Sequence, residues 1–198
     1  MTEFSDHSLF SNAYEPEYIK NYNTTFDALW FSGRFSKLAN QNYWNATIAY
    51  AMTSFWNIWD NAIAGGGFEE KYRGNWEKYE AYYVAKQYNT FASGNVAVNT
   101  TTAWDNEGIY VASFLDDANK QLNIFVTNPN NCPAILDINI KGLDWSPVSY
   151  EKYNNLEGSL IESGFYNTNI FSVEKRSSTL ISLRADDSFS ITYTSGKS

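Results

Sequence analysis

The segment YVAKQYNTFASG (residues 83–94) lies where the chain changes character. Before it, aromatic-rich segments with helical spacing flank one apolar run. After it, short β-branched segments alternate with Asn, Asp, Gly and Pro. Gly94 is a natural stop for the helix that this segment predicts, because glycine readily adopts the backbone conformation of a helix C-terminus. The composition therefore predicts two parts, residues 1–94 and residues 95–198.

The first part predicts a helix, a buried strand, a long loop and a second helix. Apolar residues from Phe26 to Gly33 recur at helical spacing, and the helix runs to about Ala39. The run ATIAYAMTSFW (residues 46–56) shows little alternation and fits a strand covered on both faces, as in a parallel sheet; a buried helix is the alternative. The loop 57–74 follows, and Asn75 is a plausible N-cap for the second helix.

The second part predicts an antiparallel β-sandwich of about eight strands. Its clearer strand segments are separated by turn-forming residues at the spacing that sandwiches show. They are 109–115, 121–127, 134–141, 148–153, 169–173, 179–184 and 189–193.

The composition of the 198-residue chain excludes several function classes. A formal net charge of −8 argues against nucleic acid and anionic membranes as partners. One cysteine, Cys132, and one histidine, His7, leave no disulfide framework and no Cys- or His-rich metal site, so we expect no metal or cofactor. No apolar run reaches transmembrane length, and the start of the chain does not resemble a signal peptide. The 7 Trp, 15 Tyr and 13 Phe can fill a core, but Tyr and Trp also suit the contact surfaces that sugars bind.

The order of the segments resembles the end of a clan A glycoside hydrolase. Met1-Thr2-Glu3-Phe4, followed by a helix and a buried strand ending in Phe55-Trp56, is similar to the last two β/α units of that clan's barrel. Residues 83–94 resemble the last barrel helix of family 30, with departures at Asn89 and Ser93. Residues 110–114, 122–128 and 178–183 resemble its sandwich. Family 39 is the next most similar. The resemblance implies the terminal β/α units of a (β/α)8 TIM barrel followed by an antiparallel β-sandwich.

The same resemblance implies a retaining glycoside hydrolase that acts on a polysaccharide or oligosaccharide outside the cytoplasm, extracellularly or in the periplasm. Glu3 corresponds to the catalytic nucleophile, and Trp56 to the aromatic residue beneath the sugar. Trp59 and His7 are further candidates for substrate binding. The acid/base of the clan lies on an earlier barrel strand, so we expect it in an N-terminal barrel portion that this chain lacks. The chain alone is then expected to be inactive.

Plainer interpretations exist for three of these residues. Glu3 can be an exposed acid without a role, and Trp56 and Trp59 can pack beneath the barrel rim. The alternative function is a non-catalytic carbohydrate-binding or structural β-sandwich module.

Overall fold

The structure is a computed structural model, and it describes residues 3–4, 24–39, 48–49, 78, 80–102 and 108–186. Its helices are α3 (Thr24–Ala39) and α5 (Glu80–Phe91). Its strands are β1 (Glu3–Phe4), β2 (Ile48–Ala49), β3 (Val96–Val98), β4 (Tyr110–Asp116), β5 (Gln121–Asn128), β6 (Ala134–Asp137), β7 (Ser149–Asn154), β8 (Ser159–Phe165), β9 (Ile170–Val173) and β10 (Ser177–Arg184). The described chain is mainly antiparallel β-sheet with few helices.

The largest sheet has six antiparallel strands in the order β3-β4-β5-β10-β7-β8. Its central strands β5 and β10 pair along their whole length, from Gln121 opposite Arg184 to Asn128 opposite Ser177. Almost every residue of these two strands is buried, because other elements cover both faces of the sheet. Strands β6 and β9 form a separate two-stranded antiparallel sheet.

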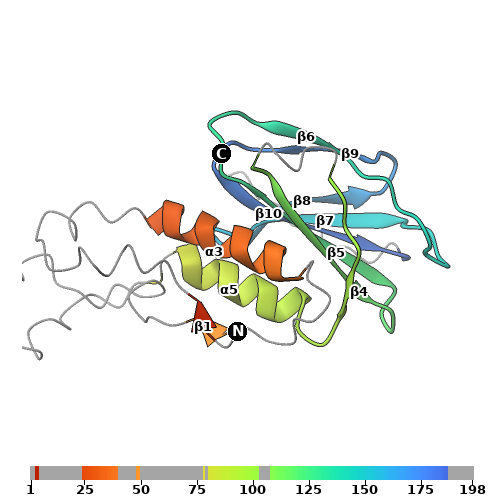
Figure 1. The fold of residues 1–198 in the computed structure, drawn as a ribbon. Helices are drawn as coiled ribbons and strands as arrows, with labels where there is room; N and C mark the ends of the chain where they lie inside the picture. Colours follow the sequence, from red (N-terminus) through yellow and green to blue (C-terminus); the bar gives the residue numbers. More distant parts are fainter. Residues whose placement is uncertain are drawn as a thin grey trace, which may run out of the picture.

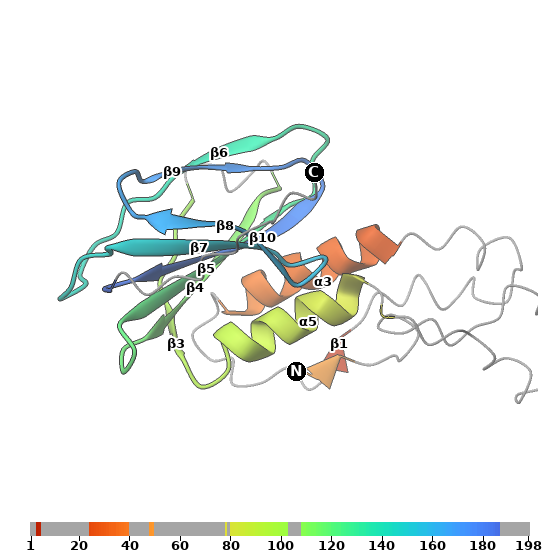
Figure 2. The same ribbon diagram turned by 180° about the vertical axis from the view of Figure 1, so that it is seen from behind.

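The sheet lies between two layers, as Figures 1 and 2 show. Helices α3 and α5 run side by side along one face, where Phe31, Val84 and Tyr88 pack against Phe125 and Leu180 of the central strands. The two-stranded sheet covers the other face, and its inward side chains complete a second core. This second core includes Leu136, Phe171, Val173, Ile181 and Leu183.

A chain of buried hydrogen bonds also joins α3 to the six-stranded sheet. Thr127 Oγ1 donates to Ser32 Oγ at 2.6 Å, and Ser32 Oγ lies 2.7 Å from Ser178 Oγ. Asn155 Nδ2 in turn donates to Ser178 Oγ at 3.0 Å. Because a buried hydroxyl without a partner is costly, these contacts favour a single placement of α3 on the sheet.

Most of the predicted elements in the described ranges are present. The first helix ends at Ala39 as expected, and the second ends at Phe91, followed by a turn to Gly94, whose φ is 81°. The observed ends of five predicted strands agree within one or two residues; these strands are β4, β5, β7, β9 and β10.

One predicted strand is shorter than expected, and strands β3 and β8 were not predicted. The predicted strand 134–141 stops at Asp137, because its partner β9 pairs with only four of its residues. Strand β8 was not predicted: SLIESGF has no steady alternation, and a β-bulge opposite Lys152 and Tyr153 interrupts its register. The predicted strand 189–193 lies outside the described residues.

Candidate functional site

Glu3 lies in a parallel pair of strands. Strand β1 pairs with β2 in parallel, with Glu3 opposite Ile48 and Phe4 opposite Ala49. Helix α3 falls between them in the chain, and α5 comes after β2. Strands that run in parallel have their carboxyl ends at the same edge of the sheet, so the chain leaves Phe4 and Ala49 on the same side. This strand–helix–strand order is the arrangement expected of a β/α unit.

The other predicted site residues lie outside the described residues. These are Trp56, Trp59 and His7. The structure therefore places Glu3 on its strand and brings none of the other three to it, and their roles stay predictions.

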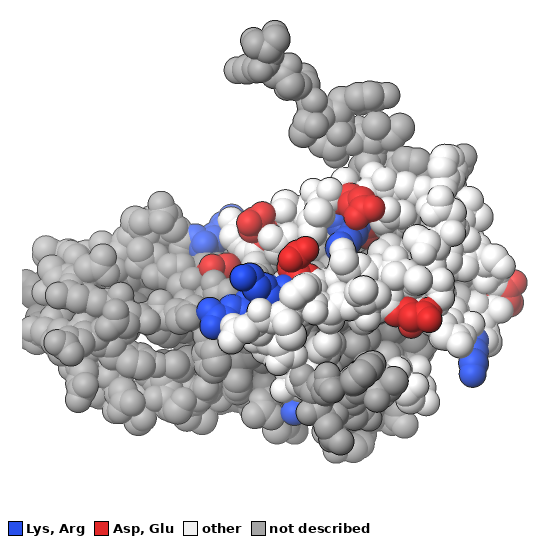
Figure 3. All heavy atoms as spheres, turned by 90° about the horizontal axis from the view of Figure 1, so that it is seen from above, with Lys and Arg blue, Asp and Glu red and all other residues white. Residues whose placement is uncertain are grey.

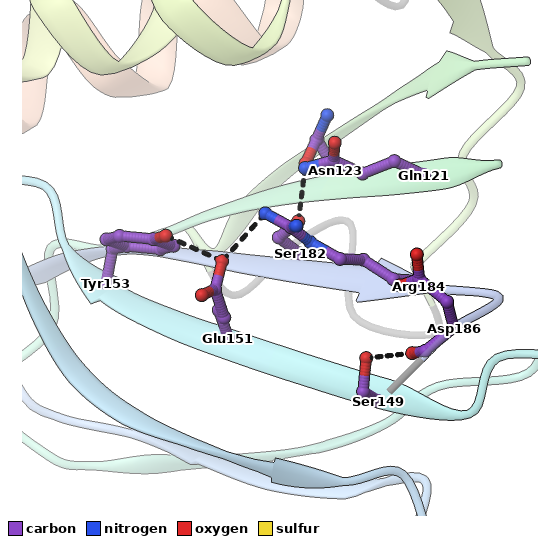
Figure 4. A network of polar contacts seen from close by, with 8 residues as sticks. All are labelled: Gln121, Asn123, Ser149, Glu151, Tyr153, Ser182, Arg184 and Asp186. Atoms are coloured by element: carbon purple, nitrogen blue, oxygen red, sulfur yellow. Dashed lines mark hydrogen bonds and ion pairs between the residues drawn. The ribbon is translucent and has the colours of Figure 1, made fainter. Parts of the chain in front are cut away.

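The structure also contains a cluster of polar side chains that was not predicted from the sequence. It lies on the helix-facing side of the six-stranded sheet (Figure 4). The Glu151 side chain on β7 is almost fully buried, with a relative exposure of 2%. Its Oε2 accepts a bond from Arg184 Nη2 at 2.9 Å and another from Tyr153 Oη at 2.7 Å. Burial, and then the Glu151 carboxylate, raise the pKa of the Tyr153 hydroxyl above its usual range.

A second set of polar side chains lies beside this group (Figure 4). Gln121 Nε2 donates to Ser182 Oγ at 2.6 Å and to Asn123 Oδ1 at 3.0 Å, and Asn123 Nδ2 donates to the carbonyl of Phe91 at 3.1 Å. The last bond joins the end of α5 to β5. The ion pair of Glu151 with Arg184 joins β7 to β10, which is a structural role for this carboxylate.

The sequence contains one signal for these contacts, the spacing of polar residues within a strand, but it does not reveal which strands pair. Glu151 and Tyr153 are two residues apart in a strand, so they share a face, as do Ser182 and Arg184. Which of these pairs meet depends on the register of β7 against β10, where Glu151 lies opposite Ser182. That register comes from the folded sheet and is not visible in either segment alone.

The described residues contain no metal centre. Within them, no three His, Cys, Asp or Glu side chains gather closely enough to hold an ion. The single cysteine, Cys132, is exposed. No helix in the described ranges has both the length and the apolar character needed to span a membrane.

Comparison with known proteins gives matches in structure only. No protein-family model and no curated protein matches the sequence. A family 30 endoxylanase from Clostridium papyrosolvens matches 93% of this chain with a TM-score of 0.62 and 18% identity. A family 30 subfamily 8 xylanase from Clostridium acetobutylicum also matches 93%, with a TM-score of 0.63 and 17% identity. A family 44 xyloglucanase from Paenibacillus polymyxa matches 94%, with a TM-score of 0.56 and 12% identity.

These matches cover only part of each enzyme. The chain spans 41% and 42% of the two xylanases and 32% of the xyloglucanase. Identities this low establish likeness of fold alone. The predicted resemblance to family 30 is confirmed at that level: the chain has the fold of a portion, less than half, of a clan A glycoside hydrolase of this kind.

Proposed function

We propose that this chain is part of a retaining glycoside hydrolase in which Glu3 is the catalytic nucleophile. The observation that carries the proposal is the parallel pairing of β1 with β2, because a (β/α)8 barrel is built from parallel strands and Glu3 lies in this pair. Helix α3 between the strands and α5 after them agree with two terminal β/α units. The likeness to xylanases over 93% of the chain supports the same assignment.

The proposed chemistry needs a second carboxyl group. Retaining glycosidases use two of them about 5 Å apart, one as nucleophile and one as acid/base. A complete barrel takes about 250 residues. Because the chain spans 41% of the Clostridium papyrosolvens enzyme, we place the acid/base and most sugar contacts on a further portion of the same polypeptide. Trp56 is the proposed platform beneath the sugar, and Trp59 and His7 are further proposed substrate contacts.

We further propose a boundary near Gly94 between the barrel portion and the sandwich, with polysaccharide as substrate and an extracellular or periplasmic location. The boundary divides the two parts in sequence but not in packing, because α3, α5, β4, β5 and β10 contribute to one core. This shared core weighs against an independent β-sandwich module. Removing the helices would expose Phe114, Phe125 and Leu180, which are at most 3% exposed.

Two measurements on xylan and xyloglucan test the proposal. In the complete polypeptide, Glu3→Gln should lower kcat by roughly 10⁴-fold, because the substituted amide cannot form the glycosyl-enzyme ester. The matched control Glu157→Gln, at an exposed turn, should keep the parent kcat. A loss of less than tenfold in Glu3→Gln would remove Glu3 from the role of nucleophile.

The second measurement uses the purified chain alone. It should hydrolyse neither polysaccharide at a measurable rate, because the proposed acid/base is absent. Efficient turnover by this chain would contradict the placement of the acid/base elsewhere.

A further inference from the structure

The segment that follows strand β3 matches the acceptor sequence for N-linked glycosylation. Asn99-Thr100-Thr101 has the required order of asparagine, any residue except proline, and threonine or serine. The chain contains two more such segments, which begin at Asn23 and Asn45. Both of these asparagines lie outside the described residues, so Asn99 is the acceptor whose surroundings the structure describes.

The structure leaves this acceptor segment accessible. Residues 99–102 form neither helix nor strand, and Asn99 and Thr101 are exposed. Thr100 between them is half-buried, and its hydroxyl donates to the carbonyl of Val98 at 3.1 Å. The middle residue is thus tied to the end of β3, while the residues that supply the acceptor amide and the threonine hydroxyl are both exposed. An acceptor is expected in a surface loop of this kind.

Strand β3 forms one edge of the six-stranded sheet (Figure 2). Within the described residues it pairs with β4 alone, and its Val96 is 65% exposed. An exposed edge strand can pair with a strand of another molecule, and proteins prevent this with short strands, charged side chains, proline or bulges. Of these, β3 has only its short length of three residues, since its sequence VAV has no charge and no proline and its register is regular.

The opposite edge of the sheet is protected in other ways. Strand β8 has Glu162 at its centre and a β-bulge in its pairing with β7. Charged side chains of both signs are also scattered over the face above the two-stranded sheet (Figure 3). The β3 edge is therefore the less protected of the two edges. A bulky hydrophilic group on the residue directly after β3 would supply the protection that the strand's own sequence lacks.

We infer that Asn99 accepts an N-linked glycan and that this glycan covers the free edge of β3. The donor is an oligosaccharide joined through its C1 atom to a polyprenyl pyrophosphate. The bond between C1 and the pyrophosphate oxygen breaks, a bond between C1 and Nδ2 of Asn99 forms, and the amide releases a proton as the lipid pyrophosphate leaves. The inference rests on the proposed extracellular location, because this modification belongs to exported chains.

Secretion of the complete polypeptide from yeast, with a signal peptide supplied by the vector, tests the modification. Trypsin places the three acceptor segments on separate peptides, residues 21–34, 38–71 and 87–120. Peptide N-glycosidase converts a glycosylated asparagine to aspartate, and mass spectrometry locates the change. We expect this conversion at position 99 in most molecules of the parent.

Two neighbouring substitutions serve as a matched pair. Thr101→Ala removes the required hydroxyl and should abolish the conversion at Asn99, whereas Thr100→Ala keeps the acceptor sequence and should leave the conversion unchanged. Glu3→Gln should be glycosylated like the parent, so a failed catalytic proposal does not affect the result. An unmodified peptide 87–120 in the secreted parent, or conversion that persists in Thr101→Ala, would overturn the inference.

The protection of the edge is measured on the same secreted proteins. Analytical ultracentrifugation at high protein concentration should show more self-association of Thr101→Ala than of the parent, because β3 is then uncovered. Val96→Lys in the Thr101→Ala background should reverse the increase, since a lysine on an edge strand disfavours pairing. Equal self-association of the parent and Thr101→Ala, or an increase that Val96→Lys leaves in place, would show that the glycan does not cover this edge.

Discussion

The hydroxyl of Tyr88 lies where the two helices meet the sheet. Its ring stacks on Phe125 with centroids 3.9 Å apart, and the residue is 5% exposed. The hydroxyl lies 2.8 Å from Ser36 Oγ and donates to the carbonyl of Ser32 at 3.2 Å. Burial raises the pKa of Tyr88 to about 12, and the bonds with Ser36 and Ser32 offset part of the effect. Folding therefore favours the neutral phenol.

This shift predicts a loss of stability at high pH. The contribution of Tyr88 is fully present below its unfolded pKa of about 10 and is lost as the pH rises through the folded pKa of about 12. Near pH 11 the free energy of unfolding should fall with pH more steeply in the parent than in Tyr88→Phe, by about 1 kcal/mol per pH unit. Urea unfolding between pH 9 and 12 measures this difference. Equal slopes in the two proteins would contradict it.

At the scale of single residues, the sequence indicated a candidate catalytic residue but not the contacts between side chains on different strands. A short motif singled out Glu3, which lies in a paired strand, and its role as nucleophile stays a prediction. The contact between Glu151 and Arg184 could not be predicted, because the two residues lie on different strands, 33 residues apart in the chain. Long-range register is a property of the whole sheet.

Among the elements, helix α3 packs closely against β4 at Gly33. A Cβ built on Gly33 would lie 2.8 Å from Cδ2 of the Tyr110 ring on β4, nearer than side chains tolerate. Lys37, one turn later, places its amine 4.8 Å from the centroid of the same ring. Glycine at this helical position therefore lets Tyr110 lie against α3.

A pair of substitutions tests this contact. Gly33→Ala alone should destabilise the protein, because the clash outweighs the gain in helix propensity of about 1 kcal/mol. In a Tyr110→Ala background the clash is absent, and the same change should stabilise the fold by about 0.5–1 kcal/mol. Thermal unfolding of the four proteins measures both values. Gly33→Ala effects that agree in sign and size in the two backgrounds would show that the ring does not cause the effect.

The elements that the sequence predicted well are those with regular patterns. Helix α3 has an apolar stripe at helical spacing. The central strands β5 and β10 each contain a run of apolar and β-branched residues that is typical of a strand. Edge strands β3 and β8 were not predicted, since an edge strand is only partly buried and its pattern is correspondingly weak.

For the whole molecule, the shared core predicts that helices and sandwich unfold together. Calorimetry should show one transition, with the calorimetric and van't Hoff enthalpies equal. Leu180→Ala, at a fully buried position in that core, should lower the midpoint of the whole transition at a cost of about 2–5 kcal/mol, whereas Ile161→Ala at an exposed position should leave it nearly unchanged. Two separate transitions, or a shift confined to one of them, would contradict a shared core.

The most direct test of the central claim is to trap a covalent intermediate on Glu3. The complete polypeptide is incubated with a 2-deoxy-2-fluoro glycosyl fluoride, which slows breakdown of the glycosyl-enzyme, and its peptides are then analysed by mass spectrometry. The account predicts one added glycosyl group on the peptide that contains Glu3, at that residue. A label on a different carboxylate, or hydrolysis of the polysaccharide with inversion and no label, would contradict it.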